Sequence, residues 1–280
     1  MKWGARIYGH VYGKGDPPWD SESWNLFEQH AGKRTTILSY GQPFGAIDTD
    51  PLRRVTARGN VPLVTVMDEG TNIEAIAAGD VDDRIDGMAR SLAAVAPASP
   101  VLRFCHEQNG NWYRYGYGHA DPAIYRRAFR RVCSRAKAIA PNARLCWCPN
   151  VIGGKTVDDP RNWYPGAGYV DLVGVDGYNQ SGLLDVDVFS PTLLRLREFT
   201  RKKPIWICET GCIEAPTKGP YLADMLKRQV PAWKVNALVY FNGDPVENGL
   251  RRTWPIESSA AATQGFREGI AQSRYEGAAT

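Results

Sequence analysis

The feature that most constrains the fold is an alternation of short apolar segments with longer amphipathic ones along the whole chain. Short runs rich in β-branched and aromatic residues predict buried strands, and the spacing of the longer segments is that of helices. No linker rich in Pro, Gly or Ser interrupts this alternation. We expect strands at Ala5–Tyr8, Thr36–Ser39, Pro62–Met67, Val101–Phe104, Arg144–Trp147, Asp171–Val175, Pro204–Ile207 and Ala237–Tyr240.

The helical segments complete a repeating strand and helix unit. They are predicted at Ser23–Ala31, Asp80–Val95, Pro122–Ala140, Pro191–Phe199, Tyr221–Gln229 and Ala260–Ala271. Eight strands that alternate with helices in about 250 residues are typical of a (β/α)₈ barrel, whereas an open doubly wound sheet normally has fewer strands. We therefore predict an α/β protein with a single (β/α)₈ TIM barrel, formed as one catalytic domain over residues 1–280. Functional groups should then follow the C-terminal ends of strands.

Composition excludes several classes of partner. The chain has 34 Lys and Arg against 30 Asp and Glu, a net charge of +4 that is too small and too mixed to favour nucleic acid. No apolar run approaches the roughly 20 residues of a membrane-spanning helix, so a membrane partner is not expected. The N-terminal segment lacks the apolar core of a secretory signal. We expect a cytoplasmic location as made, or release by a route without a signal, for example with a phage.

The six cysteines are too few and too scattered for a disulfide scaffold. We expect reduced thiols in the core. Two close pairs, Cys146 with Cys148 and Cys208 with Cys212, remain candidates for a bridge or a metal, although their spacing resembles no common ligand set.

Two predicted strands end in a glutamate. Val101–Phe104 leads to Glu107, and Pro204–Ile207 leads to Glu209. A pair of carboxylic acids is the minimal equipment for cleaving a glycosidic bond, and in a retaining site the two groups are about 5–5.5 Å apart. The alternative is that each glutamate pairs with an arginine.

The residues after Glu107 are those a sugar site needs. Sugar hydroxyls require side chains that donate and accept hydrogen bonds, and the C–H faces of sugars pack on aromatic rings. The run Gln108-Asn109-Gly110-Asn111-Trp112-Tyr113 followed by Tyr115 supplies both. Core packing is the alternative for Trp112.

Four motifs carry a specific resemblance. They are Arg103-Phe104-Cys105-His106-Glu107-Gln108-Asn109-Gly110-Asn111-Trp112, Trp147-Cys148-Pro149-Asn150, Trp163-Tyr164-Pro165-Gly166 leading into Tyr169 to Tyr178, and Lys203-Pro204-Ile205-Trp206-Ile207-Cys208-Glu209-Thr210-Gly211. In this order the chain resembles a family 26 glycoside hydrolase, from the group of β-mannanases, β-glucanases and β-1,3-xylanases in the large clan of retaining barrel enzymes.

The resemblance implies a role for each matching residue. Glu107 would be the acid/base and Glu209 the nucleophile, with His106 as a polar neighbour of the acid/base. Trp112 would be a sugar platform, and Tyr178 would donate a hydrogen bond to the nucleophile and so favour its charged form.

Other positions depart from the family pattern or only border the expected site. Gln108 stands where methionine is usual and Tyr115 where a second tryptophan is common. Tyr240 begins a segment where many members have a tryptophan platform. Further sugar contacts are expected from side chains that follow strands: Asn111, Asn150, Tyr40 and Asp68. Asp68 and its neighbour Glu69 are equally suited to capping the next helix.

These features predict a retaining glycoside hydrolase that cleaves β-glycosidic bonds in a polysaccharide or oligosaccharide by double displacement. A β-mannan, a β-glucan or a bacterial surface glycan would be the substrate, and no metal or other cofactor is expected. Two alternatives stay open: a non-catalytic carbohydrate-binding barrel, and a glycan-degrading module of a phage tail or lysis apparatus.

Overall fold

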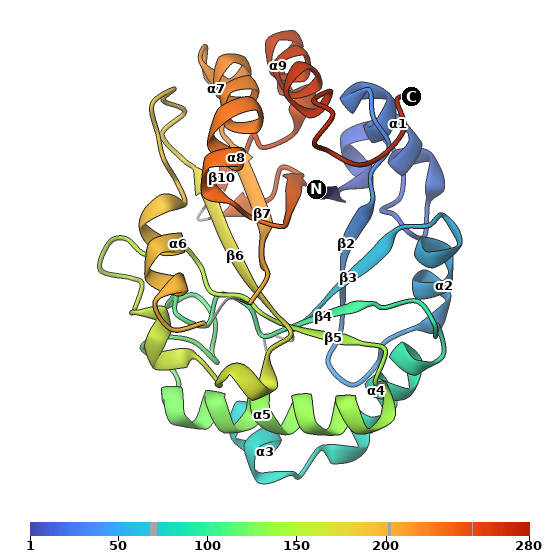
Figure 1. Ribbon diagram of the computed structural model, residues 1–280, viewed down its shortest axis with the longest axis vertical. Helices are drawn as coiled ribbons and strands as arrows, with labels where there is room; N and C mark the ends of the chain where they lie inside the picture. The colour runs from blue at the N-terminus through green and yellow to red at the C-terminus, as the bar shows by residue number, and fades with distance from the viewer. Residues whose placement is uncertain (68–71, 201–202, 248) are drawn as a thin grey trace. The chain divides into compact units, whose positions relative to one another are not determined.

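A computed structural model of the chain describes residues 1–67, 72–200, 203–247 and 249–280. Eight parallel strands follow one another in chain order around a closed barrel (Figure 1), which confirms the predicted fold class. They are β1 (Lys2–Ile7), β2 (Ile37–Gln42), β3 (Val61–Val66), β4 (Val101–Phe104), β5 (Arg144–Trp147), β6 (Leu172–Asn179), β7 (Ile205–Cys212) and β8 (Ala237–Asn242).

Five strands are longer than predicted, and the two largest extensions affect candidate residues. β6 continues to Asn179 and β7 to Cys212, so Tyr178 and Glu209 lie inside strands and do not follow them. The backbone N–H of Ile213 still donates to the carbonyl oxygen of Asn179 at 3.2 Å. Hydrogen bonding at the C-terminal ends of β6 and β7 therefore continues beyond the apolar runs from which these strands were predicted.

The main helices are α1 (Ser21–Ala31), α2 (Thr49–Ala57), α3 (Ile73–Ala78), α4 (Asp82–Ala93), α5 (Pro122–Ile139), α6 (Ser190–Arg197), α7 (Lys218–Asp224), α8 (Val230–Trp233) and α9 (Ala260–Ile270). A π-helical turn, η4 (Met225–Gln229), joins α7 to α8, and the 3₁₀ turns are η1 (Gly9–Tyr12), η2 (Pro160–Trp163), η3 (Ala167–Tyr169) and η5 (Ile256–Ser258). A short hairpin, β9 (Val246–Glu247) with β10 (Leu250–Arg251), follows β8. Helices α2, α3 and α8 were not predicted; they have nine, six and four residues, so each is short for a periodic pattern to stand out in the sequence.

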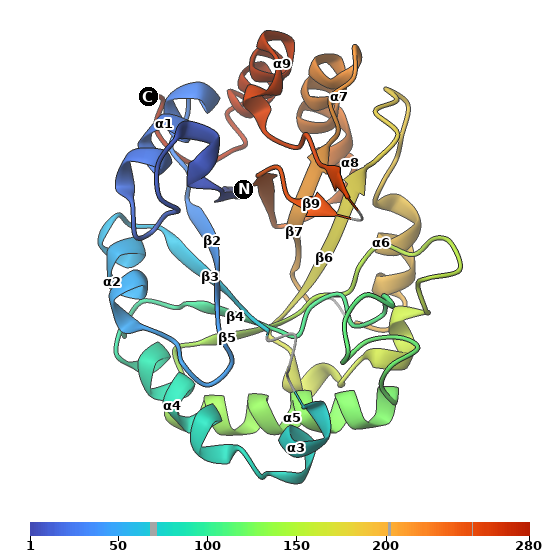
Figure 2. The same cartoon turned by 180° about the vertical axis from the view of Figure 1, so that it is seen from behind.

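The chain divides into two compact units. Unit 1 comprises Met1–Tyr40, Gly177–Ser190 and Ile207–Thr280. In it β1 pairs with both β2 and β8, and α7 lies beside α9, as both views show (Figures 1 and 2). The helices approach closely because glycines meet there: a Cβ on Gly265 would lie 2.0 Å from the carbonyl oxygen of Gly219.

Unit 2 comprises Gly41–Asp176 and Pro191–Trp206. Its strands β3, β4, β5 and β6 pair in that order, and α5 packs against α3 and α4 (Figure 2). Three ion pairs join α4 to α5: Arg131 contacts Asp82, and Arg135 contacts both Asp82 and Asp86, at 2.6 to 2.8 Å. The arginines lower the pKa of both aspartates. The expectation of one catalytic domain remains a prediction.

The six cysteines are buried and none forms a disulfide, which agrees with the expected core thiols. Burial raises the pKa of Cys133 to about 11 and that of Cys212 to about 12. Among the residues that the structure describes, none of the helices has the length and apolar character needed to cross a membrane.

Candidate active site

The chain after β4 holds an unusual backbone conformation at the predicted acid/base. Cys105 and Glu107 have φ angles of +43° and +54°, in a region of backbone conformation that residues other than glycine rarely adopt. Neighbouring strands fix both residues: Cys105 N–H donates to the carbonyl oxygen of Val66 at 3.0 Å, and Glu107 N–H donates to that of Cys148 at 2.7 Å. Such conformations persist where the surrounding structure determines them, and they gather at functional sites.

The carboxylate of Glu107 is held through both of its oxygens. Trp112 Nε1 donates to Oε2 at 2.7 Å and Asn150 Nδ2 donates to Oε1 at 2.6 Å. The residue is buried apart from 8% of its surface. Three of the predicted site residues, from two of the motifs, are therefore brought together in unit 2.

Trp112 presents a free aromatic surface beside this carboxylate. Its side chain is 43% exposed, which excludes the core-packing alternative. The indole lies directly over Gly110, where a Cβ would come within 2.2 Å of the ring. Glycine at this position therefore allows the ring to approach the backbone this closely while its Nε1 bonds to Glu107.

The loop that carries Glu107 is anchored to the residues after β5. Asn109 Nδ2 donates to the carbonyl oxygen of Asn150 at 2.9 Å, and the N–H of Asn150 donates back to Asn109 Oδ1 at 2.8 Å. Gln108 is fully buried, and with its amide turned to satisfy its neighbours it accepts from Trp147 Nε1 at 3.1 Å. This departure from the family pattern thus lies in the core. Arg103 pairs with Asp176 at 2.9 Å.

His106, Asn111 and Tyr115 also lie in this loop. The ring of His106 is 5.4 Å from that of Tyr113, and the side chain is 5% exposed. Asn111 is exposed, and its backbone N–H donates to Thr156 at 3.1 Å. Tyr115 is buried, its hydroxyl donates to the carbonyl oxygen of His106 at 3.1 Å, and burial raises its pKa. The buried Tyr115 therefore stabilises the loop through its hydrogen bond to the backbone of His106.

Unit 1 contains the second predicted carboxylate with its predicted partner. The hydroxyl of Tyr178 donates to Glu209 Oε2 at 2.6 Å, and Glu209 is 8% exposed. The Tyr178 ring lies 4.9 Å from the ring of Trp254 and 5.9 Å from that of Phe241. A Cβ on Gly211 would approach Tyr178 to 3.2 Å and Trp254 to 3.3 Å, so glycine leaves room for both rings.

Trp254 and Phe241 were not among the predicted site residues. Phe241 lies in β8 one residue beyond Tyr240, and its ring also lies 5.4 Å from that of Tyr8. Trp254 follows the β9–β10 hairpin. The available signal was a tryptophan in the segment after the last strand, where the family pattern places an aromatic platform.

Two predicted sugar contacts are not supported by their placement. Tyr240 is fully buried, its ring lies 4.9 Å from that of Phe266 on α9, and its hydroxyl donates to the carbonyl oxygen of Trp254 at 2.7 Å. Tyr40 is also fully buried, edge-on to Trp19. Neither exposes side-chain surface to a ligand. Asp68 and Glu69 lie outside the described residues.

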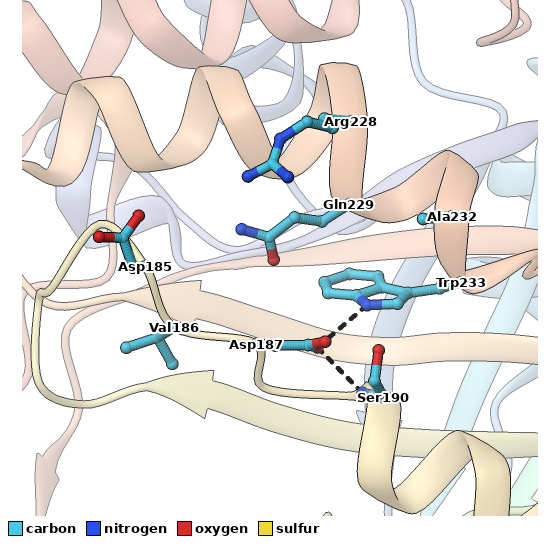
Figure 3. Close-up of a pocket in the computed structure, with 8 residues that line it drawn as sticks. All are labelled: Asp185, Val186, Asp187, Ser190, Arg228, Gln229, Ala232 and Trp233. Atoms are coloured by element: carbon cyan, nitrogen blue, oxygen red, sulfur yellow. Dashed lines mark hydrogen bonds between the residues drawn. The ribbon is translucent and has the colours of Figure 1, made fainter.

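A pocket of about 220 Å³ in unit 1 involves none of the predicted site residues (Figure 3). It is lined by Asp185, Val186, Asp187, Ser190, Arg228, Gln229, Ala232 and Trp233. Asp187 accepts from the N–H of Ser190 at 3.0 Å and from Trp233 Nε1 at 3.1 Å. Partial burial acts to raise the pKa of Asp187, but these hydrogen bonds outweigh it and keep the pKa below its usual value. The carboxylate thus links the start of α6 to the end of α8.

The comparison with known proteins identifies the family. Residues 61–211, more than half of the chain, match the family model described as glycosyl hydrolase family 26. The chain therefore belongs to glycosyl hydrolase family 26, as the resemblance predicted.

Two curated proteins are similar to this chain in sequence. The chain is 29% identical over 228 residues to endoglucanase H of Acetivibrio thermocellus, a match that covers 76% of this chain and 24% of that protein. It is 32% identical over 88 residues to the mannan endo-1,4-beta-mannosidase of Bacillus subtilis, covering 29% of this chain and 24% of that protein. The matches thus span about a quarter of the length of these relatives.

Solved structures share the fold. The catalytic domain of the family 26 endo-beta-1,4-mannanase from Bacillus sp. JAMB-750 aligns with a TM-score of 0.73 at 13% identity, over 99% of this chain and 87% of that one. The modular endo-beta-1,4-mannanase of Cellulomonas fimi aligns with a TM-score of 0.69 at 17% identity, over 89% and 66%. At these identities the likeness is one of fold.

Proposed function

We propose that this chain is a retaining glycoside hydrolase that cleaves internal β-glycosidic bonds of a glucan or mannan type of polysaccharide. One observation carries the proposal. The chain belongs to family 26, and the carboxylate of each motif glutamate accepts hydrogen bonds from side chains of its own unit. Trp112 and Asn150 hold Glu107, and Tyr178 holds Glu209. A carbohydrate is accordingly the partner.

The mechanism has two displacement steps. In the first, the carboxylate of Glu209 attacks the anomeric carbon, the bond to the leaving oxygen breaks, and Glu107 gives that oxygen its proton. In the second, Glu107 removes a proton from water, the water oxygen bonds to the anomeric carbon, and Glu209 departs. Two inversions leave the configuration unchanged.

The neighbouring residues have separate roles in this scheme. Trp112 supplies a face for a sugar ring and, with Asn150, fixes the carboxylate of Glu107. Tyr178 orients Glu209 and favours its charged form. His106 and Asn111 are polar neighbours of the acid/base. We further propose that residues 1–280 act as one catalytic domain, since the eight strands belong to one closed barrel.

The relatives support two substrate classes. The longer of the two matches is to a protein named an endoglucanase, while another relative and several solved structures are named mannanases. A binding-only barrel is not favoured, because the chain belongs to a hydrolase family and retains both glutamates.

Release of reducing ends from β-glucans, β-mannans, β-xylans and bacterial surface glycans tests the proposal. We expect release from a glucan or a mannan, with turnover abolished in Glu209→Gln and strongly reduced in Glu107→Gln. Glu268→Gln, a change at an exposed carboxylate on α9, is the matched control and should retain activity. Binding without cleavage by the unmodified protein would overturn the proposal.

A further inference from the structure

Lys218, the first residue of α7, has a fully buried side chain. Its ammonium group donates to three successive backbone carbonyls: Thr253 at 2.6 Å, Trp254 at 3.2 Å and Pro255 at 2.8 Å. It also donates to Ser258 Oγ at 2.7 Å. A buried ammonium is costly unless its donors are satisfied, and here one segment, residues 253–258, supplies all four of these acceptors.

The charges around Lys218 keep it protonated at neutral pH. Burial lowers its pKa to about 8, while Glu214, Cys212 and Glu257 act in the opposite direction. The carboxylate of Glu214 lies 3.8 Å from Nζ. The hydrogen bonds to residues 253–258 are therefore made by a charged donor, which strengthens them.

The same segment is fixed from its other side. Glu257 accepts from the hydroxyl of Tyr12 at 2.6 Å and from Asn242 Nδ2 at 3.0 Å, and the Nδ1 of His30 lies 3.0 Å from it. The backbone N–H of Ile256 donates to Asn242 Oδ1 at 2.8 Å. Residues 253–258 are thus held between the start of α7 and the end of β8.

The fixed segment carries a residue that contacts the site. The ring of Trp254 is 4.9 Å from that of Tyr178, at an interplanar angle of 30°, and the Tyr178 hydroxyl donates to Glu209. A Cβ on Gly211 would lie 3.2 Å from Tyr178 and 3.3 Å from Trp254, so the β7 backbone lies close to both side chains. A displacement of the Trp254 backbone would therefore move Tyr178 and alter its contact with Glu209.

We propose that Lys218 is a positioning residue for the nucleophile: by holding residues 253–258 it fixes Trp254 against Tyr178, and Tyr178 against Glu209. This inference rests on the proposed role of Glu209. Lys218 acts through other residues and does not touch the substrate.

A second buried lysine in unit 1 separates positioning from general stability. Lys33 is 7% exposed, and its ammonium donates to the carbonyl oxygens of Ile270 at 3.3 Å and Gln272 at 3.2 Å, at the end of α9. Burial lowers its pKa as well. It resembles Lys218 chemically but bonds to a different segment, so Lys33→Met is a matched control for Lys218→Met.

The kinetic test compares these variants on the glycan that the wild-type protein cleaves. Lys218→Met should lower kcat about tenfold or more with KM nearly unchanged, because small misplacements of a reacting group cost about that much or more. Lys33→Met should leave kcat within about twofold. In a Tyr178→Phe background the further loss from Lys218→Met should shrink to under about threefold, since residues that act in series are not additive. Full additivity, or an unchanged kcat in Lys218→Met, would overturn the proposal.

A second readout does not require activity. With tyrosine labelled at ¹³Cζ and the Tyr178 signal assigned by Tyr178→Phe, Lys218→Met should shift that signal and Lys33→Met should not. If the wild-type protein cleaves no glycan, the proposed function fails and the NMR result still decides the positioning. If the protein is active but Lys218→Met leaves kcat and the signal unchanged, only the positioning fails.

A milder variant covers the case in which Lys218→Met does not fold. Ser258→Ala removes one acceptor of the ammonium and leaves the three carbonyls. It should lower kcat and shift the Tyr178 signal in the same direction by a smaller amount. No change in either quantity would count against the proposal.

Discussion

Replacing Tyr178 with phenylalanine removes one hydroxyl and keeps the ring. The lost contact is the 2.6 Å hydrogen bond to Glu209, while the packing on Trp254 and Phe241 is retained. A hydrogen bond to a charged group contributes about 1.5–3 kcal/mol. If it orients the nucleophile in the transition state, kcat/KM should fall by about 10- to 150-fold, at 1.36 kcal/mol per tenfold change.

The same change should alter the pH profile. A donor to a carboxylate favours the charged form, so its removal raises the pKa of Glu209 relative to the wild-type protein. The acidic limb of kcat/KM against pH should therefore move toward higher pH. Initial rates on a soluble glycan across pH measure both effects.

Tyr169→Phe is a suitable control, because that tyrosine is 36% exposed and its ring lies 5.4 Å from the guanidinium of Arg130. It should behave like the wild-type protein in both measurements. A Tyr178→Phe variant with kcat/KM within twofold of wild type and an unmoved acidic limb would refute the reasoning.

Three further predictions concern other parts of the chain. Trp112→Phe keeps an aromatic face but removes the donor to Glu107, so kcat/KM should fall about tenfold, and a loss under twofold in initial-rate assays would count against the assigned role. Asp187→Ala should lower the free energy of unfolding in urea by about 1 kcal/mol at pH 7 without changing activity, as expected for a lost helix cap. Because the pKa of Asp187 is lowered in the folded state, the difference in free energy of unfolding should disappear as the pH falls below 3.8, the ordinary pKa of an aspartate. A difference that does not change with pH would contradict this prediction. The pKa of Lys218 falls from 10.5 to about 8 on folding, so between these pH values the unfolded chain binds more protons than the folded one, and the free energy of unfolding rises with pH. The difference in free energy of unfolding between the wild-type protein and Lys218→Met should rise with pH in this range. Parallel curves for the two proteins would contradict the prediction.

The alternation of segments was sufficient to predict the barrel, because hydrophobic runs mark strands that are buried on both faces. The same property hides which face each side chain occupies. Tyr240 and Phe241 are adjacent in β8, yet Tyr240 packs on Phe266 while Phe241 packs on Tyr178. A continuous apolar run has no period of two from which to choose between them, and the residue predicted to meet the sugar, Tyr240, has a fully buried side chain.

The site was predictable where its residues are close in sequence or belong to a motif. Glu107 and Trp112 are in one loop, and Tyr178 and Glu209 belong to recognised motifs. Lys218 was not predictable in this way. Its side chain meets carbonyl groups of residues 253–255, and backbone acceptors leave no trace in the residue types that surround them.

Trapping of the covalent intermediate tests the central claim most directly. A 2-deoxy-2-fluoro glycoside with an activated leaving group, of the sugar that the protein cleaves, should accumulate as a glycosyl-enzyme, since the fluorine slows its hydrolysis more than its formation. Peptide mass spectrometry should then locate one sugar on Glu209, with none in Glu209→Gln. A sugar on another residue, or no label on a protein that hydrolyses the parent glycoside, would contradict the account.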